Sequence, residues 1–353
     1  MNIAFAGGGT GGHVFPIRTL IKYIQKNNNN SNKIFWFGEK NSLEDEISRE
    51  CDCEFVPIVS GKFRREKNIV SILKNIIDIF KFGYGTLVSI YLIWKHKIDT
   101  IFCKGGYVAL PVVVGGWILR KKIIVHESDS VMGLTNKIAS KLSNFKYSGM
   151  DHKGFENIGQ IISSDLLSFD SIDTKLKKTD TKTNILVSGG SQGSRYIYKN
   201  LINAIKENPS LQNHFNFFVV LGTANKDLKE QFESINGVEV FEFLTQGQMG
   251  SLYNLCDIGI TRGGATSLAE QKLFNMRLII IPLPFTGGNH QFHNAIQYQK
   301  KYNDILISQK HFSKEIVSSS LNKFINYKKE QPNLSEINNK INKNIEKILG
   351  ISG

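Results

Sequence analysis

Cysteine is scarce in this sequence of 353 residues, and its four copies show no metal-ligand spacing. Cys51 and Cys53 form a C-x-C pair, whereas Cys103 and Cys256 stand alone. Zinc sites and disulfide frameworks both need more cysteines at closer, repeated spacings. The sequence therefore predicts reduced, ordinary cysteines of a cytosolic protein.

Long apolar runs and acidic residues are also in short supply. The longest charge-free run of the apolar region, residues 82–94, is too short to cross a bilayer as a helix. No signal peptide is expected, because a glycine-rich loop already begins at Gly7. Lys and Arg outnumber Asp and Glu by 44 to 31, and the net charge is +13. Such an excess suits nucleic acid, an anionic membrane or a phosphorylated substrate, and alone does not choose among them.

Apolar, strand-like runs alternate with helical stretches along the chain, which is typical of parallel α/β sheets. The strands expected in the first half are residues 2–6, 33–38, 54–58, 100–103 and 122–126. Those expected in the second half are residues 183–188, 217–221, 238–243, 258–261 and 278–282. Each half begins with a strand and a glycine turn, so the pattern predicts two doubly wound, Rossmann-like α/β domains.

The domain boundary is expected in the polar segment 163–182, which is rich in Ser, Asp, Thr and Lys. Residues 1–162 then form the first domain and residues 163–332 the second. Residues 333–353 form a C-terminal amphipathic helix that packs back on a domain. Its apolar positions at helical spacing are Leu334, Ile337, Ile341, Ile345 and Ile348.

The sequence GGGTGG at residues 7–12 has the G-x-G-x-x-G spacing of a dinucleotide-binding loop. Glycines let the backbone approach a ligand, and the amides that begin the next helix attract an anion. NAD is one interpretation, since Glu39 lies where a ribose-binding carboxylate is wanted. His13 favours another, because an imidazole suits the deprotonation of a hydroxyl. The structural alternative for His13 is a ring that caps the helix or binds a backbone carbonyl.

A further glycine turn, TRGGATSLAE at residues 261–270, follows an expected strand and begins a helix. Its amides and the hydroxyls of Thr266 and Ser267 suit a diphosphate, and Glu270 can accept both hydroxyls of a ribose. Alternatively, Glu270 is a surface charge and the glycines serve packing. The next loop, residues 282–291, places polar side chains at the carboxyl edge of the sheet, where a sugar could bind.

Six blocks resemble, in order, the MurG family of peptidoglycan glycosyltransferases. They are GGGTGGHVFP (7–16), GGYVALP (105–111), HESDSVMGLTNK (126–137), GGSQGSR (189–195), TRGGATSLAE (261–270) and NHQFHNA (289–295). The resemblance implies a GT-B fold with an acceptor domain, a donor domain and a cleft between them. It implies inverting transfer of N-acetylglucosamine from UDP-GlcNAc to the N-acetylmuramoyl 4-hydroxyl of lipid I, which gives lipid II. It also implies that the first loop holds no NAD and that the enzyme needs no cofactor.

The resemblance assigns roles by position. On the acceptor side, Thr10, Gly11 and Gly12 match the loop that meets the acceptor diphosphate, and His13 is our candidate base. On the donor side, Ser191 matches a residue of the second glycine loop, and Leu244 the residue whose backbone contacts the uracil. Glu270 matches the ribose ligand, Gln291 a ligand of the donor sugar, and Asp129 a position where the family more often has a sugar-contacting Asn. The diphosphate turn matches Ala265, Thr266, Ser267, Leu268 and Ala269.

Several expectations follow from what the blocks contain and lack. His126 and Glu127 are expected to have a structural or acceptor-orienting part. The sequence has no D-x-D motif, so we expect a metal to be dispensable and the amides of residues 264–267 to stabilise the leaving UDP. The family's Asn-Pro-Val-Arg segment is replaced by Gly159 to Ser163. This loss predicts weaker donor binding unless Arg195 or Arg262 compensates.

A lipid-linked acceptor requires access to a membrane. The segment of residues 61–97 combines apolar side chains with Lys62, Arg64, Arg65 and Lys67, which predicts contact with an anionic inner-membrane surface. The alternative for most of residues 69–94 is an ordinary core helix. We therefore expect a peripheral protein at the cytoplasmic face of the cell membrane, without a nucleic-acid partner. Two other functions stay open: a UDP-GlcNAc 2-epimerase, and a binder of UDP-sugar without turnover.

Overall fold

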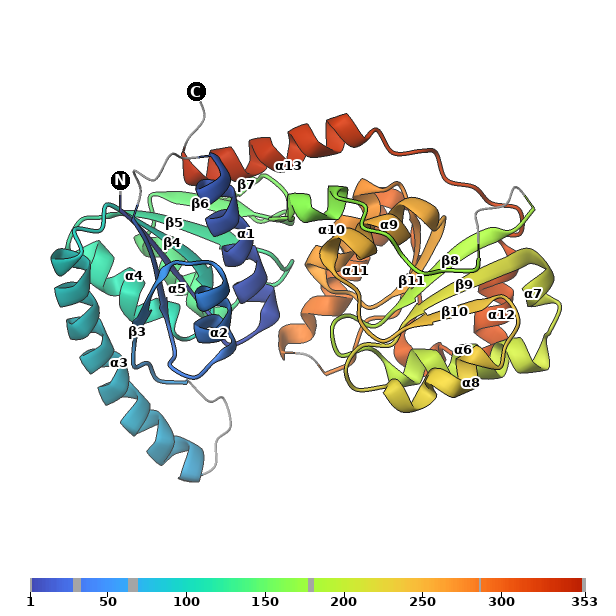
Figure 1. Cartoon of the computed structure of the whole chain (residues 1–353). Helices are drawn as coiled ribbons and strands as arrows, with labels where there is room; N and C mark the ends of the chain where they lie inside the picture. Colours follow the sequence, from blue (N-terminus) through green and yellow to red (C-terminus); the bar gives the residue numbers. More distant parts are fainter. Residues whose placement is uncertain (1, 28–32, 63–68, 177–180, 286, 351–353) are drawn as a thin grey trace. The chain divides into compact units, whose positions relative to one another are not determined.

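The computed structural model describes residues 2–27, 33–62, 69–176, 181–285 and 287–350 (Figure 1). Their contacts define two compact units. Each unit is built on one parallel sheet, which confirms the predicted fold class. The first unit comprises Met1–Ser128, Met132–Ile162 and Lys343–Gly353, and the second comprises Asp129–Val131 and Ser163–Asn342.

The sheet of the first unit has seven strands in the order β3-β2-β1-β4-β5-β6-β7. The chain therefore reverses its direction of winding at β1 and β4, and ligands of such sheets bind outside the carboxyl ends of the strands at this point. The glycine loop at residues 7–12 and the turn at residues 105–107 both lie there. The strands are β1 (Ile3–Gly7), β2 (Ile34–Gly38), β3 (Glu54–Pro57), β4 (Thr100–Gly105), β5 (Lys122–Glu127), β6 (Phe145–Ser148) and β7 (Glu156–Asn157).

Apolar side chains on the strands and helices form the core of the first unit. Val112 and Val113 of α4 are fully buried against Ile101 and Ile123 of the central strands. The buried Trp36 of β2 donates its indole N–H to the carbonyl of Gly7 (3.1 Å), which anchors the start of the glycine loop. The helices are α1 (Gly11–Asn27), α2 (Leu43–Glu50), α3 (Ile69–Lys95), α4 (Ala109–Ile118) and α5 (Leu134–Leu142).

The second unit repeats this design with six strands in the order β10-β9-β8-β11-β12-β13. The winding reverses at β8 and β11, which are followed by the glycine turns at residues 189–193 and 263–264. The strands are β8 (Thr183–Ser188), β9 (Phe215–Val220), β10 (Val238–Phe241), β11 (Ile258–Thr261), β12 (Arg277–Ile280) and β13 (Ile305–Leu306).

Eight α-helices and four short 3₁₀ turns are present in the rest of the chain that the structure describes. The α-helices are α6 (Arg195–Glu207), α7 (Leu211–His214), α8 (Lys229–Glu233), α9 (Gln246–Leu255), α10 (Ala265–Leu273), α11 (His290–Tyr302), α12 (Lys314–Asn322) and α13 (Leu334–Leu349). The 3₁₀ turns are η1 (Ser164–Leu167), η2 (Lys226–Leu228), η3 (Gly287–Asn289) and η4 (Gln309–His311).

The amphipathic C-terminal helix, α13, buries one face. Ile337, Ile341, Ile345 and Ile348 are at most 6% exposed, whereas Leu334 is 37% exposed and does not join this face. The end of the helix belongs to the first unit, where the Tyr23 hydroxyl of α1 donates to Oε1 of Glu346 (2.7 Å).

Helix α3 exposes its large apolar side chains, so the core-helix alternative is wrong. Its buried positions include Ser71, Thr86 and Ser89, while Phe80, Leu87 and Trp94 are 75%, 67% and 69% exposed. Among the described side chains of the helix, only the last turns bury apolar residues: Ile93 is fully buried, and Val88 and Leu92 pack against the core. Arg64, Arg65 and Lys67, which belong to the same predicted surface, lie outside the described residues.

The length and composition of Ser71–Lys95 within α3 are sufficient for a membrane span. Only 28% of its most apolar part is buried. The charge-free run of residues 82–94 gave too short a length for this apolar segment, because single lysines within a helix do not end its apolar surface.

Candidate functional site

The first glycine loop connects β1 to α1 at the carboxyl edge of the first sheet. The helix begins where the carbonyl of Thr10 accepts the amides of His13 (3.0 Å) and Val14 (3.1 Å). The amides of Gly11 and Gly12 have no intrahelical partner, as at any helix start. This end of α1 therefore presents N–H groups suited to an anion.

His13 is oriented by the loop from which it projects. Its Nδ1 lies 3.0 Å from the carbonyl oxygen of Gly8 and 3.3 Å from Oγ1 of Thr10. A carbonyl oxygen only accepts, so Nδ1 carries the proton, and the lone pair of the neutral ring is on Nε2. The contact fits the structural alternative, a ring bound to a backbone carbonyl. It also leaves Nε2 as the basic atom.

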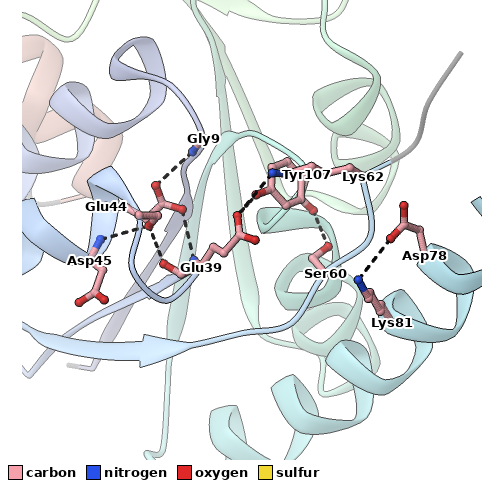
Figure 2. A network of polar contacts seen from close by, with 10 residues as sticks. Gly9, Glu39, Glu44, Asp45, Ser60, Lys62, Asp78, Lys81 and Tyr107 are labelled. Atoms are coloured by element: carbon pink, nitrogen blue, oxygen red, sulfur yellow. Dashed lines mark hydrogen bonds and ion pairs between the residues drawn. The ribbon is translucent and has the colours of Figure 1, made fainter. Parts of the chain in front are cut away.

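Glu39 does not have the setting of a ribose ligand. Its Oε2 accepts the hydroxyl of Tyr107 and lies 3.7 Å from the ammonium of Lys62, which also sits 4.6 Å from the centre of the Tyr107 ring (Figure 2). The nearby buried carboxylate of Glu44 accepts the amide of Gly9 (3.1 Å), so this amide is not available to a dinucleotide phosphate. Both contacts oppose the NAD interpretation.

The second glycine turn, after β8, packs closely on the neighbouring loop. A Cβ at Gly193 would lie 1.7 Å from the carbonyl oxygen of Leu221, so only glycine fits. Ser191 is exposed, and its carbonyl accepts the amide of Thr223 (3.3 Å). Leu244 is 9% exposed and directly precedes Thr245, the N-cap of α9.

Helix α10 begins directly after the turn at Gly263 and Gly264. Its first amides, from Ala265 to Ser267, have no intrahelical partner and point out of the helix start. Leu268 is fully buried and its amide closes the first turn on the carbonyl of Gly264 (3.0 Å). Ala269 lies one residue further on the same helix. The predicted diphosphate turn is therefore the N-terminus of a helix.

Glu270 is a buried carboxylate rather than a surface charge. It is 9% exposed, and its Oε2 accepts the hydroxyl of Tyr253 from α9 (3.1 Å). Burial raises the pKa of Glu270 to about 7, while the hydrogen bond from Tyr253 opposes this rise. Oε1 lies beside this bonded oxygen and is the acceptor that a ligand hydroxyl could use.

Gln291 and Asn294, both on α11, bind the backbone around the donor-side turn. The side-chain oxygen of Gln291 accepts the amides of Gly263 (3.2 Å) and Leu283 (3.0 Å), which directs its N–H₂ group away from them. The fully buried Asn294 donates to the carbonyl of Gly263 (2.9 Å) and to Oδ1 of Asp129 (2.9 Å). Asp129 thus has an amide partner within the second unit.

Comparisons with known proteins match the two units to the two domains of one glycosyltransferase family. The models of the glycosyltransferase family 28 N-terminal and C-terminal domains match residues 3–145 and 184–348. A relative from Vesicomyosocius okutanii is 30% identical over 320 residues, 90% of this chain and 88% of its own. It is named UDP-N-acetylglucosamine–N-acetylmuramyl-(pentapeptide) pyrophosphoryl-undecaprenol N-acetylglucosamine transferase. This chain belongs to the MurG family.

Further relatives and structures agree with membership of the MurG family. The transferase of the same name from Legionella pneumophila is 33% identical over 84% of this chain and 82% of its own. The crystal structure of Acinetobacter baumannii MurG is 20% identical, covers 98% of this chain and 94% of its own, and has a TM-score of 0.71. A Neisseria meningitidis UDP-GlcNAc 2-epimerase, 12% identical over 99% of this chain and all of its own, has a TM-score of 0.60. The shared fold therefore does not separate transferase from epimerase.

Two arginines, Arg195 and Arg262, were named as possible substitutes for the missing arginine of the MurG pattern. At the aligned segment, Gln160 donates to the carbonyl of Ser128 (2.7 Å), and Ser163 caps η1 by accepting the amide of Asp165 (3.2 Å). Arg195 is paired with Asp227 (2.7 Å). The buried Arg262 donates to the carbonyl of Ile281 (3.1 Å) and to Oγ of Ser194 (2.6 Å). Both arginines named as candidates are thus held by protein partners.

The pair His126 and Glu127 at the end of β5 has structural contacts. His126 is fully buried, and its Nε2 donates to the carbonyl of Gly159 (3.0 Å). Burial, and then the cation of Lys104, hold the pKa of His126 well below its usual range, so the ring is neutral. Glu127 accepts the side chain of Asn136 (3.0 Å) and the amide of Gly133 (3.1 Å). These contacts fit a structural or orienting part.

Sequence reasoning did not single out Glu44, which contacts the first glycine loop, or Tyr253 and Asn294, which contact Glu270 and Gly263. Each of the three reaches its motif from another helix. Only Asn294 lay inside a recognised block, NHQFHNA. Among the described residues, no three His, Cys, Asp or Glu side chains gather as metal ligands, and all four cysteines are free thiols.

Proposed function

We propose that this chain transfers N-acetylglucosamine from UDP-GlcNAc to the 4-hydroxyl of the N-acetylmuramoyl group of lipid I, an undecaprenyl-linked acceptor, and so forms lipid II. The observation that carries this proposal is the relation to transferases of this specificity, which extends over 90% of the chain at 30% identity. The matching family models include the first glycine loop with His13 and the turn before α10.

The acceptor hydroxyl is activated by His13. Nε2 takes the hydroxyl proton as the oxygen attacks the anomeric carbon, and the bond from that carbon to the UDP oxygen breaks on the opposite face. The configuration is therefore inverted. The amides of Thr10, Gly11 and Gly12 hold the acceptor diphosphate at the start of α1, and the carboxylate of Glu44 on the Gly9 amide keeps anions from moving further into the loop.

The donor is held by the second unit. Glu270 accepts the ribose hydroxyls, the backbone of Leu244 contacts the uracil, and the turn of residues 265–269 holds the diphosphate with Ser191 nearby. The N–H₂ group of Gln291 and the carboxylate of Asp129 bind the sugar. The amides that begin α10 stabilise the charge that develops on UDP, as preorganised donors do, so the chemical step needs no metal.

The exposed apolar side of α3 contacts the membrane. Side chains such as Phe80 and Leu87 dip into the interface, while Lys62 and the basic residues that follow it attract anionic lipid. We propose that the protein is peripheral and acts at the cytoplasmic face of the cell membrane, where its lipid-linked acceptor is embedded.

The test follows radiolabelled UDP-GlcNAc in detergent with and without a lipid I analogue. Label that enters the lipid fraction only when the acceptor is present supports the proposal. Conversion of UDP-GlcNAc to its 2-epimer without acceptor would favour an epimerase, and binding without any conversion would favour a non-catalytic binder. Addition of EDTA should leave transfer unchanged; loss of transfer that Mg²⁺ restores would contradict the metal-free step.

A further inference from the structure

Glu44 is a buried carboxylate beside the first glycine loop, and the mechanism above gives it no chemical step. It lies in the first turn of α2 and is fully buried. Each of its oxygens accepts one backbone amide, Oε2 that of Gly9 (3.1 Å) and Oε1 that of Glu39 (3.2 Å) (Figure 2). Two amide donors on two oxygens are the arrangement that an ionised carboxylate satisfies and a neutral amide does not.

The surrounding backbone makes room for this side chain. A Cβ at Gly8 would lie 2.1 Å from Oε1 of Glu44, and a Cβ at Gly38 would lie 2.6 Å from its Cγ. Glycines at the ends of two neighbouring strands thus let the carboxylate reach the loop. Gly8 is an x position of the G-x-G-x-x-G pattern, so the room for Glu44 comes from a glycine that this pattern does not require.

Glu44 and His13 bind opposite ends of one peptide group. The peptide between Gly8 and Gly9 is trans, so its C=O and N–H point in opposite directions. The N–H end donates to Glu44, and the C=O end accepts Nδ1–H of His13 (3.0 Å). Hydrogen bonds in a chain polarise one another, so the negative charge of Glu44 strengthens the acceptor that His13 uses.

We propose that Glu44 is a positioning residue for His13, acting through the Gly8–Gly9 peptide. The arrangement does through one peptide what the aspartate of a Ser-His-Asp triad does directly: it fixes the tautomer and stabilises the imidazolium. The inference rests on the proposed function for its kinetic consequence only, because the tautomer can be measured without turnover.

Other ionisable groups of the first unit lie near the hydrogen bonds that connect Glu44 to His13 through the Gly8–Gly9 peptide. The ring of Tyr107 lies 3.5 Å from where a Cβ of Gly9 would be, and its hydroxyl binds Glu39. Lys62 pairs with Glu39 (3.7 Å), and the Cβ of Lys104 lies beside Gly7. A substitution at Glu44 removes none of these groups, so they are the same in all the variants compared below.

The test compares Glu44→Gln with the wild type and with Glu46→Gln, which removes the same charge from an exposed position of the same helix. We expect Glu44→Gln to lower kcat on the order of 10-fold, the lower end of the effect of losing the outer hydrogen-bond partner of a metal-bound histidine, with an unchanged KM for UDP-GlcNAc. Without the carboxylate the imidazolium is less stable. The acidic limb of the kcat–pH profile should therefore move to lower pH. Glu46→Gln should change neither quantity.

Two further readouts separate positioning from general damage. In a His13→Ala background, Glu44→Gln should lower turnover by less than 2-fold, because its effect passes through His13. In ¹⁵N-histidine NMR spectra of the full chain, neutral His13 should carry its proton on Nδ1 in the wild type and shift toward Nε2 in Glu44→Gln. The NMR result stands even if the wild type shows no transfer, which would refute the proposed function alone.

An acidic limb and a tautomer that both stay unchanged in Glu44→Gln would overturn the proposal. The proposal would also be overturned if Glu44→Gln lowered turnover equally in the wild type and in the His13→Ala background. If Glu44→Gln does not fold, Glu44→Asp serves instead, because it keeps the charge and withdraws it from the Gly9 amide. The acidic limb of the kcat–pH profile should then also move to lower pH. An unchanged limb would contradict the proposed role of Glu44.

Discussion

The hydroxyl of Tyr253 in α9 donates a 3.1 Å hydrogen bond to Oε2 of Glu270 in α10, and both side chains are buried. The bond holds the carboxylate in one orientation and leaves its other oxygen for a ligand. Burial raises the pKa of Glu270 to about 7, and Tyr253 limits that rise. The protonation of this carboxylate is therefore sensitive to pH near neutrality, and we expect the proposed donor binding to follow it.

Replacement of Tyr253 by Phe should weaken the donor site. Without the phenol the pKa of Glu270 rises further, so less carboxylate is available at pH 7. A hydrogen bond to a charged group contributes about 1.5–3 kcal/mol, so we expect UDP affinity to fall roughly 10-fold or more at pH 7. The loss should shrink at pH 8.5, where the carboxylate is again ionised. Titration calorimetry with UDP at both pH values measures this, and equal affinity of variant and wild type throughout would contradict it.

Replacement of Glu270 by Gln should stabilise the unliganded protein while abolishing tight donor binding. A buried acid with a raised pKa contributes stability below its unfolded pKa of 4.5, and this stability is lost as the pH rises through about 7. At pH 8 the neutral Gln avoids that cost, so the free energy of unfolding should increase by about 3 kcal/mol. At pH 4 the two proteins should be equally stable. Denaturant unfolding at both pH values checks the sign, and a less stable Gln variant at pH 8 would refute it.

Replacement of His13 by Ala should remove the base without affecting the second unit. General base catalysis contributes about 10²- to 10⁴-fold, so we expect kcat to fall by at least about 100-fold. UDP-GlcNAc binding should be unchanged. His311→Ala, at an exposed position of the second unit, is the matched control and should behave as the wild type. Turnover of His13→Ala within a few fold of the wild type would show that His13 is not the base.

Charges placed on α3 should detach the protein from membranes. Phe80→Glu and Leu87→Glu replace two strongly exposed apolar side chains, each of which contributes about 1.5–3 kcal/mol when fully buried in an apolar phase. We expect cosedimentation with vesicles containing anionic phospholipid to fall at least 10-fold, with unchanged thermal stability. Phe243→Glu is the control, because Phe243 is equally exposed, at 71%, in the second unit. Equal loss of binding in all three variants would exclude a specific role for α3.

The parallel sheets were predictable from the sequence because buried strands are short, apolar and separated by helices. β8 and β11 have the expected bounds, Thr183–Ser188 and Ile258–Thr261. The short strands β6, β7 and β13 were not expected. β7 and β13 have only two residues each, too few for an apolar pattern that stands out from a loop.

The glycine turn and the start of the helix that carries Glu270 were also predictable, since they are contiguous in the sequence. Tyr253, the partner of Glu270, was not, because the contact depends on how α9 and α10 pack. Glu44 escaped notice for the same reason: 35 residues separate it from Gly9. The outward apolar side of α3 could not be read from periodicity, which shows that a helix has two faces but not which one meets the protein.

The anomeric configuration of the product tests the central claim, a single displacement on UDP-GlcNAc by an acceptor hydroxyl that His13 activates. The product made from UDP-GlcNAc and a soluble lipid I analogue is purified, and the coupling constant of its new anomeric proton is measured by NMR. The account predicts a β-linked N-acetylglucosamine on the acceptor, inverted from the α-linkage of the donor. An α-linked product, or label that remains in the nucleotide fraction, would contradict it.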